Sequence, residues 1–273
     1  MGALPSIRAS ITTTVRYWLQ TEVHVYAFSI AANVLLSFFP FLIVCVSLGR
    51  MVFDAQSMLS ALDLAFQDFF PSALGDFMHR NLPQPQPVEF LSIFILLFSA
   101  NGIFEPLEVA LNKVWGIHQN RSFLRNQLIS LVLIFVCGTL ALLSLAIAAI
   151  GQKNGSDFLV IRWVSILFYK SAAVPLTVLI LYLVYRYLPN GRPPANRVIP
   201  AAIGVGILLE ALKSINAWAW PAFDAKLQRE YGVFRYSATL IFLSFLSSML
   251  VLGGAEWAAR GHRLDSQKLD KKS

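Results

Sequence analysis

The chain has 273 residues, of which 56% are hydrophobic and only 14% are charged, and its formal net charge is +7. Soluble domains contain about 25% charged residues, so this composition excludes an ordinary soluble protein of this length. The long apolar runs therefore indicate a lipid environment. Basic residues gather beside the spans of membrane proteins, so the positive charge does not by itself indicate nucleic acid.

Residues 1–25 predict an amphipathic segment on the cytoplasmic side of a membrane. Between residues 6 and 22, apolar side chains recur at helical spacing, and Arg8, Arg16 and two threonines fall largely between them. This pattern is typical of a helix that lies on the membrane surface. A short helix packed on the rest of the bundle is equally compatible with it.

Residues 26–259 predict a transmembrane domain of six helices, which makes the fold class all-α. Six apolar segments each have roughly the 20 residues that are needed to cross a ~30 Å hydrocarbon core. These segments are residues 27–48, 88–111, 127–150, 163–185, 198–220 and 236–258.

Two segments outside the spans complete the predicted organisation. Residues 54–82 carry one apolar face among polar residues, which predicts an external helical segment, and the proline-rich stretch 83–87 ends it. Residues 260–273 are charged and predict a cytoplasmic tail without regular structure.

The distribution of Lys and Arg predicts that both termini are cytoplasmic. Of the 22 basic residues, 13 fall on the side of the termini and 7 on the opposite side. Basic residues are enriched in cytoplasmic loops, so the larger number marks the inner side. The last external loop weakens this asymmetry, because it contains Lys226, Arg229 and Arg235.

Polar side chains in the second apolar segment suggest a functional face. Asn101, Glu105, Glu108 and Asn112 recur at steps of four, three and four residues, which places them on one side of a helix. A charge at the centre of a bilayer costs at least ~2.5–3.5 kcal/mol. We therefore expect this face to contact protein or water, in the cytoplasmic half of the membrane.

Other segments contribute further polar groups. Asn33 lies in the first segment, Lys170 in the fourth, Glu210 and Lys213 in the fifth, and Glu256 near the cytoplasmic end of the sixth. Glu210 and Lys213 are three residues apart and can share a helix face. Glu210 with Lys170 or Lys213 is a candidate buried ion pair. Such pairs either fix helix packing or line a path for a transported molecule, and the sequence leaves both open.

No pattern of catalytic or metal-binding residues stands out. The four histidines are far apart in the sequence, and there is no HExxH motif, paired-cysteine zinc spacing, phosphate-binding loop or nucleophile elbow. The sequence therefore predicts no cofactor, no metal site and no enzyme. Because the basic residues follow the membrane spans, no nucleic acid is expected as a partner.

Several short motifs extend together from about Tyr26 to Ala259. They are residues 26–40, Glu108–Trp115, Leu188-Pro189-Asn190 with Arg197 and Pro200, Tyr231-Gly232, and Gly254-Ala255-Glu256. These motifs resemble the YihY/BrkB family of bacterial inner-membrane proteins. The chain departs from the family pattern at Asn33, where an aromatic residue is usual, and at residues 241–245, where a Trp and a Tyr are common.

The resemblance implies a six-helix fold in the bacterial inner membrane and an unsettled biochemical role. Members of the family were formerly labelled ribonuclease BN, and the absence of nuclease ligands here disfavours that reading. The BrkB label refers to resistance to serum killing, which implies an effect on the cell envelope. We therefore expect transport or translocation of an envelope component such as a lipid, with membrane lipids as partners and homo-oligomerisation left open. The alternative is a non-transporting scaffold or envelope-integrity factor that binds protein partners.

Overall fold

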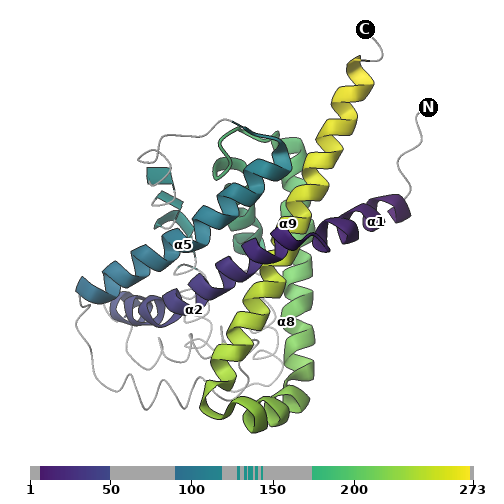
Figure 1. Cartoon of the computed structure of the whole chain (residues 1–273). Helices are drawn as coiled ribbons and strands as arrows, with labels where there is room; N and C mark the ends of the chain where they lie inside the picture. Colours follow the sequence, from purple (N-terminus) through teal and green to yellow (C-terminus); the bar gives the residue numbers. More distant parts are fainter. Residues whose placement is uncertain are drawn as a thin grey trace, which may run out of the picture.

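The computed structural model describes residues 7–49, 90–118 and 174–270 together with helical positions between 128 and 143 (Figure 1). Every element in this part of the chain is a helix. The predicted all-α class is therefore confirmed for the described residues. The external segment 54–82 and Lys170 lie outside them.

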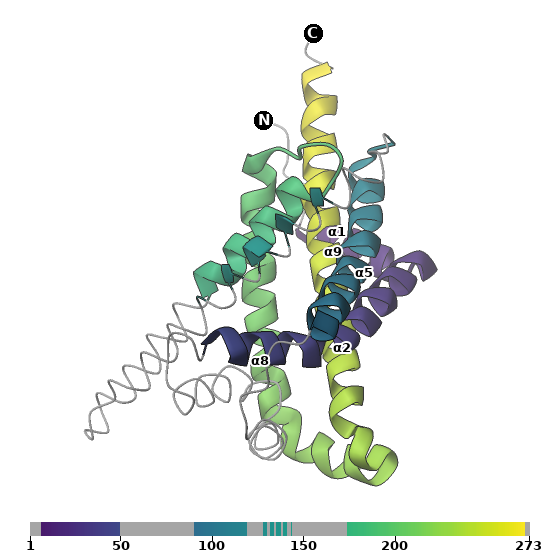
Figure 2. The same cartoon turned by 90° about the vertical axis from the view of Figure 1, so that its left-hand side faces the viewer.

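The first two helices lie where the sequence predicts an amphipathic segment and a first span, with shifted boundaries. Helix α1 covers Ile7–Trp18 and α2 covers Thr21–Gly49. The chain breaks between them, where the N–H of Gln20 donates to the carbonyl of Tyr17 at 3.0 Å. The second half of α2 contains Pro40 and runs in a different direction from the first (Figure 2). A proline removes one helical hydrogen bond and kinks the helix, which accounts for the change of direction.

Helix α5 covers Phe90–Trp115 and ends at a glycine. Gly116 has φ of 67°, a left-handed conformation that costs little only for glycine. The N–H of Ile117 donates to the carbonyl of Asn112 at 2.9 Å, and the N–H of Gly116 donates to that of Lys113 at 3.1 Å. This pair of bonds is the Schellman motif, which satisfies carbonyls at a helix end.

The last two helices form an antiparallel hairpin. Helix α8 covers Ala195–Tyr231, the short 3₁₀ helix η1 covers Gly232–Phe234, and α9 covers Arg235–Asp270. Helix α8 contains the predicted fifth span and α9 contains the predicted sixth, and each helix extends beyond its span. The prediction of an irregular tail from residue 260 is wrong as far as Asp270, because α9 continues through it.

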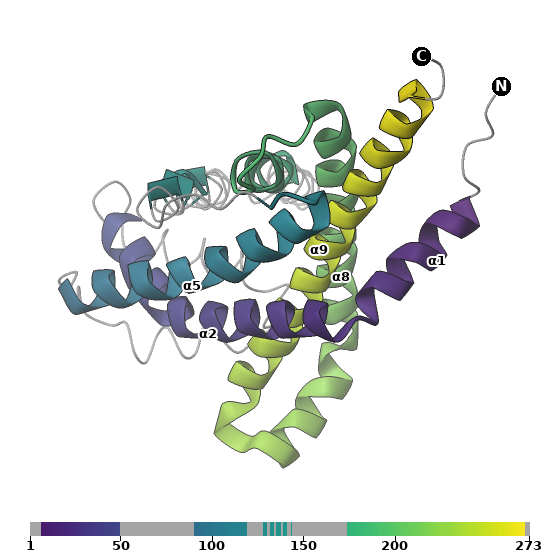
Figure 3. The ribbon, with the colours of Figure 1, turned by 45° about the horizontal axis from the view of Figure 1, so that its top comes forward.

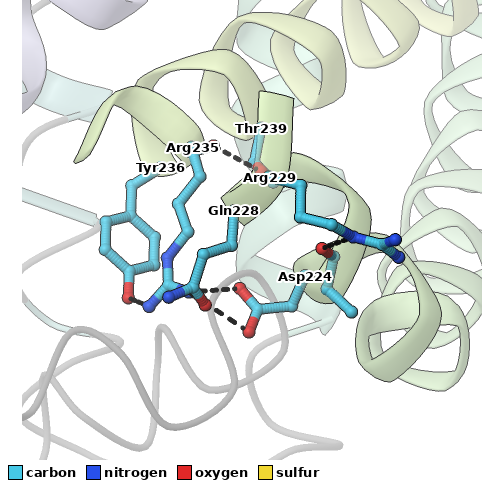
Figure 4. Close-up of polar contacts among 7 residues, drawn as sticks. Asp224, Gln228, Arg229, Arg235, Tyr236 and Thr239 are labelled. Carbon is cyan, nitrogen blue, oxygen red and sulfur yellow. Dashed lines mark hydrogen bonds and ion pairs between the residues drawn. The ribbon is translucent and has the colours of Figure 1, made fainter. Parts of the chain in front are cut away.

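A polar network stabilises the turn of this hairpin (Figure 4). The Arg235 guanidinium lies 3.2 Å from the Asp224 carboxylate, donates to Gln228 Oε1 at 2.5 Å and contacts the hydroxyl of Tyr236. Lys226 lies 4.0 Å from Glu230. Two of the three basic residues that weaken the predicted charge asymmetry thus pair with acids of the same hairpin.

Helix α9 is the centre of the described bundle. It packs against α1, α2, α5 and α8, and α2 also packs along α5. Figure 3 shows α9 between α8 on one side and α2 with α5 on the other. The buried core gathers where these helices meet the helix Val174–Tyr187. It includes Ile30, Leu107, Leu111, Tyr185, Val205 and Leu252.

Three of the described helices are long and apolar enough to cross a membrane. They are Thr21–Phe38, Ala195–Tyr231 and Arg235–His262, and 28–39% of the residues in their most apolar windows are buried. Large apolar side chains therefore remain exposed on their surfaces, as expected for helices that face lipid. Among these side chains are Phe28, Leu36, Ile207, Ile215, Trp218 and Phe242.

Candidate functional site

Two adjacent glycines allow neighbouring helices to approach α9 closely. A Cβ atom at Gly253 would lie 2.5 Å from the indole nitrogen of Trp18, and one at Gly254 would lie 2.2 Å from Cγ2 of Val205. Real Cβ contacts are essentially never this short. The two glycines therefore permit close helix packing.

Two aromatic side chains donate to the backbone of α9 from either side of this glycine pair. Nε1 of Trp18 donates to the carbonyl of Met249 at 2.8 Å, and the hydroxyl of Tyr185 donates to the carbonyl of Val251 at 2.7 Å. Buried indole and phenol groups need such partners. These bonds attach α1 and the helix Val174–Tyr187 to α9.

A charged cluster connects α1 to α9 one turn beyond the glycines. Glu256 is buried, and its Oε2 accepts from the hydroxyl of Thr14 at 3.3 Å and lies 3.4 Å from Arg260. Arg260 also donates to the Thr14 hydroxyl at 3.0 Å. The Glu256 carboxylate thus contacts a cation of its own helix, and the sequence did not predict this partner.

A second buried network links α5 to the turn after the helix Val174–Tyr187. Glu108 is 5% exposed, and its Oε1 accepts from Nδ2 of Asn112 at 3.3 Å. Oδ1 of Asn112 accepts from the backbone N–H of Asn190 at 2.7 Å. The motif at Glu108–Trp115 and the Leu188-Pro189-Asn190 motif, far apart in the sequence, therefore meet in the fold.

A cleft of about 280 Å³ opens between α1, α2, α5 and α9. Val23 and Val114 give it apolar walls. Charged and hydrogen-bonding side chains also line it, and they are Thr13, Arg16, Tyr17, Gln20, Glu22, Tyr26, Lys113 and Glu256.

Tyr17 in the cleft has a perturbed acidity. Burial, the charge of Glu256 and the neighbouring Tyr26 raise the pKa of the Tyr17 phenol far above 10.0, its ordinary value. The folded state therefore keeps a proton that the unfolded chain loses above about pH 10. It follows that this group contributes stability below about pH 10 that is lost as the pH rises further.

We expect Tyr17→Phe, which cannot ionise, to reduce this alkaline loss of stability. The thermal unfolding midpoint in detergent, measured near pH 9 and near pH 11, would fall less for Tyr17→Phe than for wild type. The control is Tyr231→Phe, which removes an exposed phenol and should behave as wild type does. An equal fall in all three proteins would contradict the assignment.

The residues predicted on the second span are only partly brought together. Glu108 and Asn112 are joined by a hydrogen bond, but Glu105 is exposed. Only part of the predicted polar face of α5 is therefore buried against the rest of the bundle. Asn101 lies within α5, and its side chain is outside the described set.

The other predicted polar residues lie at separate places. Asn33 faces α5, where a Cβ at Gly102 would lie 2.2 Å from its Oδ1. Glu210 and Lys213 form an ion pair on α8 with an N–O distance of 2.5 Å, but their side chains are 31% and 22% exposed, so the pair is half-buried and not buried as predicted. Lys170, the other predicted partner of Glu210, lies outside the described residues.

Sequence reasoning missed the contacts that α1 makes with α9. Helical periodicity placed Trp18 on the apolar face of α1, which was a usable signal for its burial. Thr14 and Arg260 gave no comparable signal, because periodicity assigns a residue to a face but does not name the partner of that face. Among the described residues, no group of three His, Cys, Asp or Glu side chains could hold a metal ion.

Comparison with known proteins identifies the family of the chain. The family described as Virulence factor BrkB matches residues 14–273. The chain belongs to this family.

The BrkB-family relatives have names that describe little chemistry. A UPF0761 membrane protein of Neisseria meningitidis serogroup B is 24% identical over 253 residues, which are 88% of this chain and 60% of the relative. The ribonuclease-like protein YfkH of Bacillus subtilis is 24% identical over 241 residues, covering 84% of this chain and 86% of the relative. The chain thus spans 60% of the length of the Neisseria relative. No solved structure matches the chain.

Proposed function

We propose that this BrkB-family protein is a six-span protein of the bacterial inner membrane with cytoplasmic termini. We further propose that it is not an enzyme and that it transports or translocates a component of the cell envelope, with a lipid as the favoured cargo. The observation that carries this proposal is the Glu210–Lys213 pair on α8, one of the helices suited to cross a membrane.

The position of the pair within α8 supports the proposal. With a rise of ~1.5 Å per residue, Glu210 lies ~22 Å along the helix from Ala195, within the ~30 Å depth of a hydrocarbon core. Its side chain is 31% exposed and that of Lys213 is 22% exposed. Ions accessible at this depth are costly unless protein or water surrounds them. A polar path for cargo would provide those surroundings.

We expect Glu210→Gln to abolish cargo binding without unfolding the bundle. The neutral amide keeps the shape of the side chain but no longer balances the charge of Lys213. Native mass spectrometry of the gently extracted proteins would show a lipid or envelope precursor on wild type, with occupancy at least about tenfold lower on the variant.

The matched control is Glu230→Gln, which removes the negative charge of the exposed Lys226–Glu230 ion pair on the same helix. This variant should retain the cargo. A thermal unfolding midpoint close to that of wild type would confirm that Glu210→Gln is folded. Equal retention of the cargo by all three proteins, measured apart from phosphatidylglycerol, would contradict translocation and favour a scaffold. An unfolded Glu210→Gln would assign the pair to packing.

A further inference from the structure

We propose that the cleft between α1, α2, α5 and α9 binds the phosphate group of an anionic membrane phospholipid. This site is separate from the Glu210–Lys213 pair. The inference goes beyond the proposed function, because it holds equally for a transporter and for a scaffold that keeps a bound lipid.

The ion pairs around the cleft leave one positive charge over. Lys113 pairs with Glu22 across α5 and α2, and Glu256 pairs with Arg260 on α9. Arg16 also lines the cleft. Within the part of the chain that the structure describes, Arg16 forms no ion pair. The cleft therefore presents an uncompensated guanidinium.

The groups beside Arg16 suit a phosphate. A guanidinium can hold two phosphate oxygens at once, and the Lys113 ammonium can add a third contact while it remains near Glu22. Thr13 and Gln20 also line the cleft and carry donors of the kind that phosphate oxygens accept. When Arg260 is counted, which pairs with Glu256 but does not itself line the cleft, the group carries one excess positive charge. This charge matches the single negative charge of a phosphodiester.

The cleft lies where the headgroup of a lipid would be. The apolar helix suited to span a membrane begins at Thr21, directly after Arg16 and Gln20. The end of α1 and the start of this span therefore lie at headgroup depth. Basic pockets between transmembrane helices on the cytoplasmic side are known sites for lipid headgroups.

Apolar side chains next to the cleft can accompany the acyl chains of the same lipid. Leu19 is 76% exposed, and Val25 and Val109 are also exposed. Val25 is one helical turn from Glu22, and Val109 is one turn from Lys113. A free phosphate would make no use of these surfaces. The 280 Å³ cleft lies just below the ~300–1,000 Å³ of sites for whole ligands, which fits a headgroup whose tails lie outside.

The test compares lipid retention by four proteins. Wild type, Arg16→Gln, Arg16→Lys and Arg192→Gln would be purified and exchanged into mixed micelles containing equal phosphatidylglycerol and phosphatidylcholine. Arg192→Gln is the control, because it removes an exposed arginine from another loop of the same predicted side. Native mass spectrometry would then measure which lipid each protein retains.

We expect wild type and Arg192→Gln to retain phosphatidylglycerol preferentially, Arg16→Gln to bind it about tenfold more weakly, and Arg16→Lys to recover part of the binding. Equal retention by Arg16→Gln and wild type would overturn the proposal, as would indifference between the two lipids. If inorganic phosphate alone bound with the same dependence on Arg16 and displaced the lipid, the lipid source would be rejected in favour of soluble phosphate.

The same measurement on Glu210→Gln separates this inference from the proposed function. If the cleft is an independent site, Glu210→Gln retains phosphatidylglycerol even where its cargo is lost. Conversely, loss of cargo from Glu210→Gln with unchanged lipid retention by Arg16→Gln would leave the proposed function standing and reject the cleft.

Discussion

Gly254→Ala is expected to lower the free energy of unfolding by about 1–3 kcal/mol, because the added methyl group overpacks a filled interface. The new Cβ would lie 2.2 Å from Val205 Cγ2 and 3.0 Å from the Tyr185 hydroxyl. Val205 is buried and has little room to move. The shift would also disturb the bond from Tyr185 to the carbonyl of Val251.

The same substitution at Gly204 provides the control. Gly204 is on α8, and a Cβ there would meet nothing within 4 Å. Alanine favours the helix by about 1 kcal/mol relative to glycine, so Gly204→Ala should be neutral or stabilising. Thermal unfolding in detergent would compare the two variants. A Gly254→Ala protein as stable as Gly204→Ala would show that α8 and α9 are not packed as closely as described here.

Asn112→Ala is the second substitution with a large expected effect, a loss of about 1–3 kcal/mol. It removes the amide that donates to the buried Glu108 carboxylate and accepts from the N–H of Asn190. Asn112→Asp should be at least as damaging. It keeps an oxygen for Asn190 but replaces the donor to Glu108 with a second carboxylate one helical turn away.

Unfolding in detergent would measure both Asn112 variants against Asn196→Ala, which truncates an exposed asparagine near the start of α8. We expect this control to stay within about 0.5 kcal/mol of wild type. If Asn112→Ala were equally silent, the contact between α5 and the turn at residues 188–190 would contribute no stability.

The positions of the helices could be predicted because a run of about 20 apolar residues marks a helix that is long enough to cross a membrane. The first, second, fifth and sixth apolar segments each coincide with a helix, but α8 and α9 run further than predicted. An apolar window marks the part of a helix that suits lipid and not where its hydrogen bonding ends. Charged residues interrupt the apolar pattern of α8 after Trp220 and that of α9 after residue 259, and the helices continue through them.

Contacts within one helix were also predictable, whereas contacts between distant elements were not. The spacing of Glu210 and Lys213 indicated their ion pair, because residues three apart share a helix face. Thr14 and Glu256 are 242 residues apart, and no local pattern connects them. The same limit explains Glu105, whose spacing placed it on the Glu108 face although it is exposed. Spacing gives the direction of a side chain relative to its helix but not what lies opposite.

The central place of α9 has a consequence for biosynthesis. Helices α1, α2, α5 and α8 are all made before α9, yet each packs against it. Until α9 has left the ribosome and entered the bilayer, the donors on Trp18 and Tyr185 lack their acceptor carbonyls. The other four helices therefore remain an incomplete assembly, with these polar groups unpaired, until α9 joins them.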